Sequence, residues 1–236
     1  MKHKIIIVIL IILVVGCERP TPPPDGPIIE QSIIDELLEK TIAIDSFQFF
    51  YNITGLNEKR YYYMLGPDIK VAFPTIKHLE DGTPYDTVYM EREKKIAYTY
   101  CSKKSCPEKD PYAEPINFSL YNIDTPREKV FILNKAELVR EELYKERYYV
   151  EVINFTNTDG DNGLMWVQSY YGVPLKLEYL DKEGNKKTLV YENISWDSVR
   201  DINVAIPYNT TLIGYNGKNV SVYGKLSKPW LVQTAS

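Results

Sequence analysis

The chain has 236 residues, a formal net charge of −4 and only two histidines, while tyrosine occurs 20 times. A net acidic chain without a concentrated basic run is not expected to bind nucleic acid, because phosphate binding needs a basic face. The scarcity of histidine also leaves little material for histidine-based catalysis or metal sites.

The N-terminal segment predicts export. Lys2 and Lys4 precede an apolar run at residues 5–15, and Gly16 then precedes Cys17. A basic start, a short apolar run and a small residue are the parts of a secretory signal peptide. As a helix the apolar run would reach only about 16 Å, against a hydrocarbon core of roughly 30 Å, so a stable transmembrane anchor is not expected.

Residues 14–17 (Val-Val-Gly-Cys) resemble a lipobox, the signal of prokaryotic lipoproteins in which the cysteine becomes the lipid-modified first residue of the mature chain. The resemblance implies that residues 1–16 are a lipoprotein signal peptide and that Cys17 is the lipid attachment site. The protein would then be held at the outer, extracytoplasmic face of the cell membrane. The alternative is an ordinary cleaved signal followed by an incidental cysteine, but a single cysteine directly after a small residue favours the lipoprotein.

The mature chain would have 220 residues, enough for one domain with a sizeable core. Without Lys2 and Lys4, 26 basic residues face 32 acidic ones, so the mature net charge is −6. Residues 17–27 are proline-rich and predict an extended tether of about 30 Å, the alternative being a simple disordered leader. A single domain is expected at residues 28–236.

An amphipathic helix is expected directly after Pro27, with charged residues away from its apolar face. The residues of that face are Ile29, Ile33, Ile34, Leu37, Leu38 and Thr41.

Short runs rich in aromatic and β-branched residues, separated by turn residues, predict an antiparallel meander. The runs lie at residues 47–54, 60–65, 69–73, 87–91, 95–101, 147–154, 164–168, 173–180, 187–194 and 219–223.

The sequence leaves the structure of two segments undecided. Residues 136–144 contain good helix formers but also suit a strand that turns back through residues 144–147. Residues 102–127 form a long connection, which in a compact domain is usually a lid or a binding loop.

The alternation within these runs predicts a sheet with one apolar face. In residues 47–54 the even positions are mainly polar, and in residues 173–180 Lys176 and Glu178 interrupt the apolar residues. A second apolar set comprises Ile96, Tyr98 and Tyr100. Such a face either packs as an ordinary core or lines a ligand cavity, and the pattern leaves both alternatives open.

Cys101 and Cys106 are the other two cysteines. In an exported chain, two nearby cysteines predict a disulfide, which for so short a loop contributes roughly 2 kcal/mol. A metal site would need further ligands, and a redox site would prefer two intervening residues.

Sequons of the form Asn-x-Ser/Thr occur six times, at Asn52, Asn117, Asn154, Asn193, Asn209 and Asn219. Chance would give about 1.6 from the 14 Asn and 25 Ser plus Thr of the mature chain. The excess predicts glycosylation on an exported surface. Because general N-glycosylation among prokaryotes is chiefly archaeal, the lipobox and the sequons together indicate an archaeal cell-surface lipoprotein. The alternative is that Asn and Thr gather at turns and strand ends without glycans.

Other motifs predict no chemistry. The acidic and amide residues at 157–163 resemble a calcium loop, but Asn162 replaces the required glycine and Gln168 the bidentate glutamate, so a hairpin turn is expected. No phosphate loop or nucleophile elbow occurs, and His78 has no evident nucleophile partner. We therefore expect no enzyme activity, no cofactor and no metal site.

Several segments in order resemble the lipoprotein-sorting carrier family, the LolA-like proteins with their LolB, LppX and RseB relatives. They are a helix running into 44–47, the Met-Trp-Val strand at 165–167, the Gly-Val-Pro turn and alternating strand at 171–178, the hairpin at 181–184, and Tyr-Glu-Asn-Ile at 191–194. The resemblance implies a mainly β, α+β fold, in which an incomplete antiparallel β-barrel wraps over a few helices. It also implies an apolar cavity for acyl chains or lipoproteins, and no catalytic residues.

The sequence thus predicts a membrane-anchored lipoprotein whose LolA-like domain binds a lipid or another hydrophobic ligand. The residues expected to contact that ligand are Phe47, Phe49, Tyr51, Tyr98, Trp166, Leu175 and Leu177. The alternative is a packed interaction or sensor module without a cavity, whose partner is another envelope protein. A cavity of several hundred Å³ near residues 102–127 favours the first function, and a filled core favours the second.

Overall fold

The computed structural model describes residues 33–55, 58–103, 106, 112–207, 210–214, 217 and 219–221. They belong to one compact unit, Ser32–Ser236. The signal peptide, the tether and the first turns of the expected helix lie outside the described residues. Within the described part of the chain, no helix is long and apolar enough to cross a membrane.

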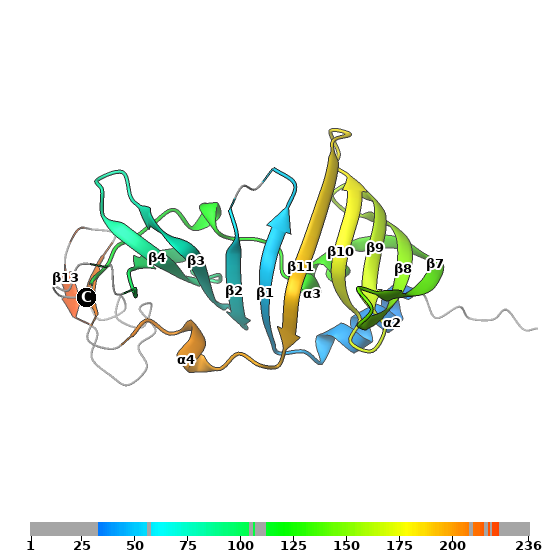
Figure 1. Cartoon of the computed structure of the whole chain (residues 1–236), viewed down its shortest axis with the longest axis horizontal. Helices are drawn as coiled ribbons and strands as arrows, with labels where there is room; N and C mark the ends of the chain where they lie inside the picture. The colour runs from blue at the N-terminus through cyan, green and yellow to red at the C-terminus, as the bar shows by residue number, and fades with distance from the viewer. Residues whose placement is uncertain are drawn as a thin grey trace, which may run out of the picture. The chain divides into compact units, whose positions relative to one another are not determined.

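The main element is a ten-stranded antiparallel sheet in the order β5-β4-β3-β2-β1-β11-β10-β9-β8-β7 (Figure 1). Its strands are β1 Ser46–Ile53, β2 Arg60–Leu65, β3 Asp68–His78, β4 Pro84–Glu91, β5 Ile96–Tyr100, β7 Leu133–Tyr144, β8 Tyr148–Asn157, β9 Asn162–Gln168, β10 Val173–Leu180 and β11 Lys186–Trp196. The edge strands β5 and β7 do not pair with each other. The predicted incomplete antiparallel barrel is therefore confirmed.

Short elements complete the described part. The helices are α2 Ile33–Ile42, α3 Pro126–Phe131, α4 Asp201–Val204 and the 3-10 turn η1 Phe118–Leu120. The strands β6 Tyr112–Ala113, β12 Thr211–Ile213 and β13 Asn219–Ser221 form a second sheet in the order β13-β12-β6. The strand expected at residues 219–223 thus exists as β13 but belongs to this second sheet.

The open segment 136–144 is a strand, because it pairs with β8 along its length. The connection turns at Lys145 and Glu146, whose φ angles of 51° and 55° reverse the chain within a few residues. Pairing with β8 outweighs the helix propensity of this segment, which is worth only tenths of a kcal/mol per residue, about 0.7 at most.

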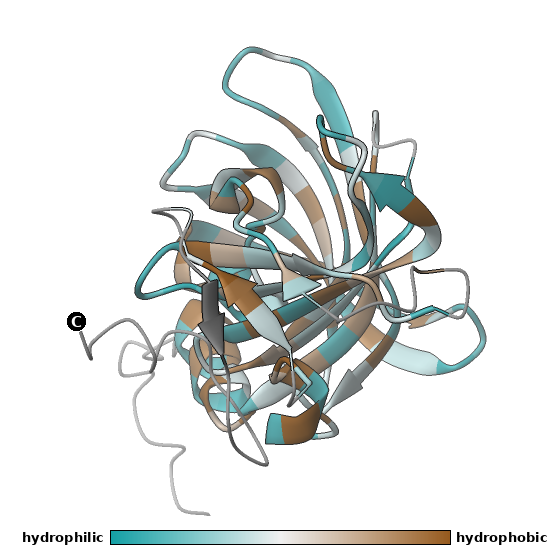
Figure 2. Cartoon of the chain, turned by 90° about the vertical axis from the view of Figure 1, so that its left-hand side faces the viewer, coloured by the Kyte–Doolittle hydropathy of each residue, from teal (hydrophilic) through white to brown (hydrophobic). Residues whose placement is uncertain are grey.

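One face of the sheet, the inner face, carries most of the core. Phe49 and Tyr62 are directly paired on it and are almost completely buried. Asn52, which points the other way from β1, is exposed. Figure 2 shows the resulting change from hydrophobic to hydrophilic colour along the strands. The predicted alternation of residues 47–54 is confirmed.

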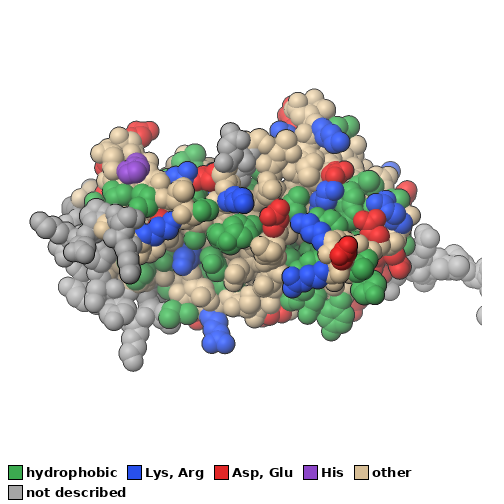
Figure 3. Space-filling model, in the orientation of Figure 1, with side chains coloured by type: hydrophobic (Ala, Val, Ile, Leu, Met, Phe, Trp, Pro, Cys, Tyr) green, Lys and Arg blue, Asp and Glu red, His purple; other side chains and the backbone are tan. Residues whose placement is uncertain are grey.

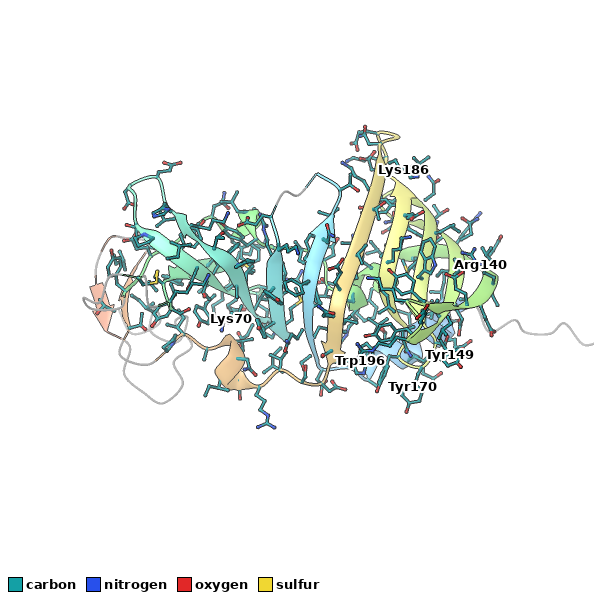
Figure 4. All side chains as sticks on the ribbon, in the orientation of Figure 1. Lys70, Arg140, Tyr149, Tyr170, Lys186 and Trp196 are labelled. Carbon is teal, nitrogen blue, oxygen red and sulfur yellow. A yellow bond between two sulfur atoms is a disulfide. The ribbon has the colours of Figure 1, made fainter. Side chains whose placement is uncertain are left out.

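Helix α2 packs on β7, β10 and α3. It approaches the β9–β10 turn so closely that Thr41 Oγ1 donates a hydrogen bond of 3.1 Å to the carbonyl oxygen of Gly172. Beside this turn the ring of Tyr171 lies 4.2 Å from that of Trp196. Tyr170, which is 76% exposed, lies toward the same end of the sheet as Trp196 (Figure 4). The β9–β10 turn and α2 are therefore in direct contact at the end of the sheet that carries Trp196.

Candidate functional site

Residues 116–131, which we call the cover segment, lie on the inner face and are fastened there by tyrosine hydroxyls. Tyr62 donates a hydrogen bond of 3.0 Å to the carbonyl oxygen of Tyr121, and Tyr191 donates one of 3.3 Å to that of Asp124. The hydroxyls of Tyr85 and Tyr121 lie 2.7 Å apart. Burial raises the pKa of Tyr62 to about 12, so this hydroxyl stays protonated and able to donate.

The middle of the inner face is filled by aromatic rings. Phe49 stacks on Tyr62 at 5.7 Å and meets Tyr191 edge-on at 4.9 Å. Phe73 meets Tyr121 of the cover segment edge-on at 5.5 Å. These distances are those of favourable aromatic pairs, so the middle of the half-barrel is a packed core.

A groove of about 620 Å³ remains at one end of the inner face, and we call it the Phe47 groove. Its lining comes from the start of β1, the β2–β3 and β4–β5 turns, and the cover segment including α3. The lining residues are Asp45, Phe47, Met64, Gly66, Pro67, Arg92, Glu93, Lys95, Phe118, Asn122, Thr125, Arg127, Glu128 and Phe131. The groove thus has an apolar floor with charged groups around it.

Arg92 joins the β4–β5 turn to α3. Its Nη1 lies 2.6 Å from Glu128 Oε1, and its Nε donates a hydrogen bond of 3.0 Å to Asn122 Oδ1. Glu128 Oε2 also accepts a hydrogen bond of 2.7 Å from the backbone nitrogen of Thr125, which closes a capping box at the start of α3. The charges of Arg92 and Glu128 therefore neutralise each other and fix one wall of the groove.

Arg127 follows Pro126 in the first turn of α3 and lines the same groove. Its Cζ lies 5.8 Å from the centre of the Phe47 ring. Its Nε and Nη2 atoms are buried and have no hydrogen-bond partner among the residues that the structure describes. The guanidinium therefore lies over the aromatic floor with unsatisfied donors.

The residues predicted to contact a ligand do not lie together. Most belong to the inner face, whereas Trp166 and Tyr98 lie elsewhere. Phe47 lines the groove, whereas Phe49, Leu175 and Leu177 are almost completely buried in the main core and Tyr51 is half-buried in the same aromatic cluster.

Trp166 lies on the other face of the sheet. It pairs with Lys176, while its neighbour Met165 pairs with the core residue Leu177. The Lys176 ammonium lies 4.2 Å from the Trp166 ring centre, and Trp166 Nε1 donates a hydrogen bond of 2.7 Å to Glu142 Oε1. Trp166 is therefore buried by its own sheet neighbours, away from the groove.

Tyr98 also points away from the inner face. It packs with Tyr89, Ala113, Ile206 and Leu212 in a small second core under the three-stranded sheet. The apolar face expected from Ile96, Tyr98 and Tyr100 therefore exists, but it contacts the second sheet.

The predicted disulfide between Cys101 and Cys106 is present. Four sequon asparagines are exposed: Asn52, Asn117, Asn154 and Asn193. Asn209 and Cys17 lie outside the described residues, and the side chain of Asn219 is not among those described. Glycosylation and lipid attachment therefore stay predictions.

The segment that resembles a calcium loop forms a hairpin turn. Asn157 Oδ1 accepts hydrogen bonds from the backbone nitrogens of Asp159 and Asp161, at 3.0 Å and 2.9 Å. Asn157 Nδ2 donates to Asp161 Oδ2 at 3.0 Å. No metal-ligating cluster of three or more His, Cys, Asp or Glu residues occurs among the residues that the structure describes. Asn157 Oδ1 and Asp161 Oδ2, which could serve as calcium ligands, thus accept hydrogen bonds within the turn.

The sequence reasoning did not single out Arg92, Arg127 or α3. A signal for α3 exists, because Thr125-Pro126 followed by Glu128 is a capping box with proline at the first helical position. Over the face in view, Figure 3 shows acidic and basic side chains interspersed, without a single-sign field on that face.

Comparison with known proteins gives structural neighbours only. No family model matches the chain, and no curated protein matches it. Among solved structures, MucB is 12% identical, with a TM-score of 0.45, and the match covers 75% of this chain and 63% of that one. The chain thus spans less than two thirds of the length of MucB.

Two further neighbours carry the name of the family that the sequence resembles. The LolA superfamily protein NE2245 from Nitrosomonas europaea is 15% identical over 73% of this chain and 97% of that one, with a TM-score of 0.33. A putative outer membrane lipoprotein-sorting protein domain from Vibrio parahaemolyticus is 10% identical over 71% and 92%, with a TM-score of 0.34. Structures of the LolA superfamily are therefore among the structural neighbours of this chain.

Proposed function

We propose that the protein is a membrane-anchored extracytoplasmic lipoprotein whose LolA-like domain binds a lipid or a similar amphipathic molecule in the Phe47 groove. The observation that supports this function is the groove itself. Its volume of about 620 Å³ lies within the range of roughly 300–1,000 Å³ of small-molecule sites. It also lies against the segment expected to act as a binding loop.

The lining suits an apolar chain. Phe47 and Met64 are almost completely buried and form the floor, while Phe118 and Phe131 line the groove from the cover segment. Phe131 is 48% exposed, so an apolar ligand would remove part of its surface from water. Burial of such surface contributes about 25 cal/mol per Å². The apolar part of the lining therefore suits an acyl chain.

Attachment at Cys17 would decide how the ligand is exchanged. The proline-rich tether of about 30 Å would keep the domain beside its own membrane. A ligand would then be taken from or passed to that membrane locally, and the protein would act as a fixed receptor rather than a diffusing shuttle.

The function is tested with the Cys17→Ser variant, which removes the lipid so that binding can be measured without detergent. Fluorescence of a pyrene-labelled dodecanol reports binding. Phe131→Asp should weaken binding several-fold to about tenfold, since covering the exposed half of one aromatic side chain is worth roughly 0.7–1.5 kcal/mol. Leu120→Asp is the matched control, because Leu120 is 56% exposed on the cover segment but does not line the groove.

Retained binding in the Leu120 variant and lost binding in the Phe131 variant support the groove as the site. Equal binding by both variants would contradict the proposal, and so would failure of the parent protein to bind this probe and its anionic analogues alike. Native mass spectrometry of the lipidated chain adds a second observation, because a ligand that co-purifies identifies the class of molecule bound in the cell.

The second candidate function is a packed module that binds another envelope protein. The observation that favours it is the filled middle of the inner face, where Phe49, Tyr62 and Tyr191 leave the predicted lining residues buried among one another. Under this function the purified protein carries no lipid, and cross-linking in intact cells captures a protein partner on the described surface.

A further inference from the structure

Arg127 is the one guanidinium of the Phe47 groove that lacks partners for buried donor atoms among the described residues. Both its Nε and its Nη2 are buried without an acceptor, whereas Arg92 in the same groove contacts Glu128 and Asn122. Burying a charged donor without an acceptor costs free energy, and most buried polar groups in folded proteins are satisfied. A rotation of the guanidinium toward a ligand oxygen in the groove would give these donors an acceptor and remove this cost.

The position of Arg127 agrees with a role at the ligand. Its guanidinium lies 5.8 Å from the ring of Phe47, at the floor of the groove, and the capping box between Thr125 and Glu128 fixes the turn of α3 that carries it. A guanidinium presents several donors in a planar fork, which matches two oxygens of a carboxylate or a phosphate.

The other charges of the groove do not compensate Arg127. Glu128 is held by Arg92 at 2.6 Å. Asp45, Glu93 and Lys95 are exposed, so water and salt screen their charges. The half-buried Arg127 is therefore the charge that an anion inside the groove meets with the least screening.

We propose that Arg127 binds the anionic headgroup, a carboxylate or a phosphate, of an amphipathic ligand whose apolar chain lies on Phe47, Met64 and Phe131. This inference rests on the proposed function of the groove. It adds the polarity of the ligand: the site selects acidic amphiphiles over neutral ones, and the headgroup lies beside α3.

The test compares three pyrene-labelled probes on the Cys17→Ser background: a dodecanoate, a lysophosphatidate and a dodecanol. The parent should bind both anionic probes more tightly than the alcohol. Arg127→Gln should weaken the anionic probes about 10- to 100-fold, the size of hydrogen bonds to charged groups, and leave the alcohol unchanged. The stronger of the two anionic probes identifies the headgroup as carboxylate or phosphate.

Two further variants separate recognition from folding. Arg127→Lys should retain part of the preference because it keeps the charge. Arg92→Gln breaks the contacts with Glu128 and Asn122 and leaves the Glu128 carboxylate uncompensated beside Arg127. It should therefore also weaken the anionic probes, but unlike Arg127→Gln it should lower the stability of the fold. Arg127→Gln should unfold at the same denaturant concentration as the parent or a higher one, since it removes unsatisfied donors.

The outcomes distinguish the two proposals. If the parent binds no probe, the proposed function of the groove fails. If the parent binds the alcohol as tightly as the anions, or if Arg127→Gln leaves the anionic probes unaffected, the groove still binds amphiphiles but the assignment of Arg127 is wrong.

Discussion

The contact between α2 and the β9–β10 turn should depend on the absence of a side chain at Gly172. Gly172 has a φ of +65°, and a Cβ there would lie 2.8 Å from the carbonyl oxygen of Leu37 and 2.9 Å from Lys40 Cβ. The carbonyl oxygen belongs to the helix backbone and cannot rotate away. Gly172→Ala must therefore shift either α2 or the turn.

The expected loss of stability has two parts. A left-handed backbone costs a non-glycine residue roughly 1–2 kcal/mol, and forcing an extra methyl into a packed contact costs about 1–3 kcal/mol. Together these give about 2–5 kcal/mol, and the shift also strains the hydrogen bond from Thr41 Oγ1 to the Gly172 carbonyl.

Gly66→Ala is the matched control. Gly66 has a similar φ of +56°, but no atom lies within 4 Å of the position that its Cβ would take. It should therefore lose only the backbone part, about 1–2 kcal/mol. Urea unfolding followed by far-UV circular dichroism measures both variants. If Gly172→Ala is no less stable than Gly66→Ala, α2 does not pack on the turn as described.

Two further predictions concern single interactions. Cys101→Ser with Cys106→Ser should lower the unfolding free energy by roughly 2 kcal/mol, and a reductant should bring the parent to the same midpoint while leaving the variant unaffected. The pKa of Glu142 is lowered in the folded protein by hydrogen bonds, first from Arg140 and then from Trp166. The stability that Glu142 contributes is thus present above the ordinary glutamate pKa of about 4.3 and is lost as the pH falls through the lower folded value. Glu142→Gln should be about 1 kcal/mol less stable than the parent at pH 7, by urea unfolding, and the difference should vanish in acid; a difference that persists unchanged at low pH would contradict this.

Much of the sheet could be predicted from local sequence. The alternation in residues 47–54 places Phe49 in the core and Asn52 in water, because successive strand residues point to opposite faces. The turn residues between the runs separate the strands, as at Gly66, where φ is positive. Strand alternation and turn residues depend on a few neighbouring residues, so both can be recognised without knowing which strands pair.

The candidate site could not be predicted in the same way. The turns at Gly66 and Arg92 lie side by side because β3 pairs with β4, and Arg92 N donates a hydrogen bond of 3.0 Å to the carbonyl oxygen of Pro67. Helix α3 with Arg127 joins them from a distant part of the chain, which local sequence does not indicate. Trp166 is a complementary case. It was expected to contact the ligand, but its pairing with Lys176 places it on the face opposite to Leu177. Strand parity alone does not say which of two neighbouring apolar residues faces inward until the partner strand is known.

The high tyrosine content explains why the groove lies at one end of the half-barrel. Phenylalanine could fill the middle of the inner face equally well, but only a hydroxyl can satisfy a buried backbone carbonyl of the cover segment, as Tyr62 does for Tyr121. Each such bond holds the cover segment down, and the rings that donate the bonds occupy the space below it. Under the proposed function a ligand enters where the fastening ends, beside Phe47, where Arg127 has donors without an acceptor among the described residues.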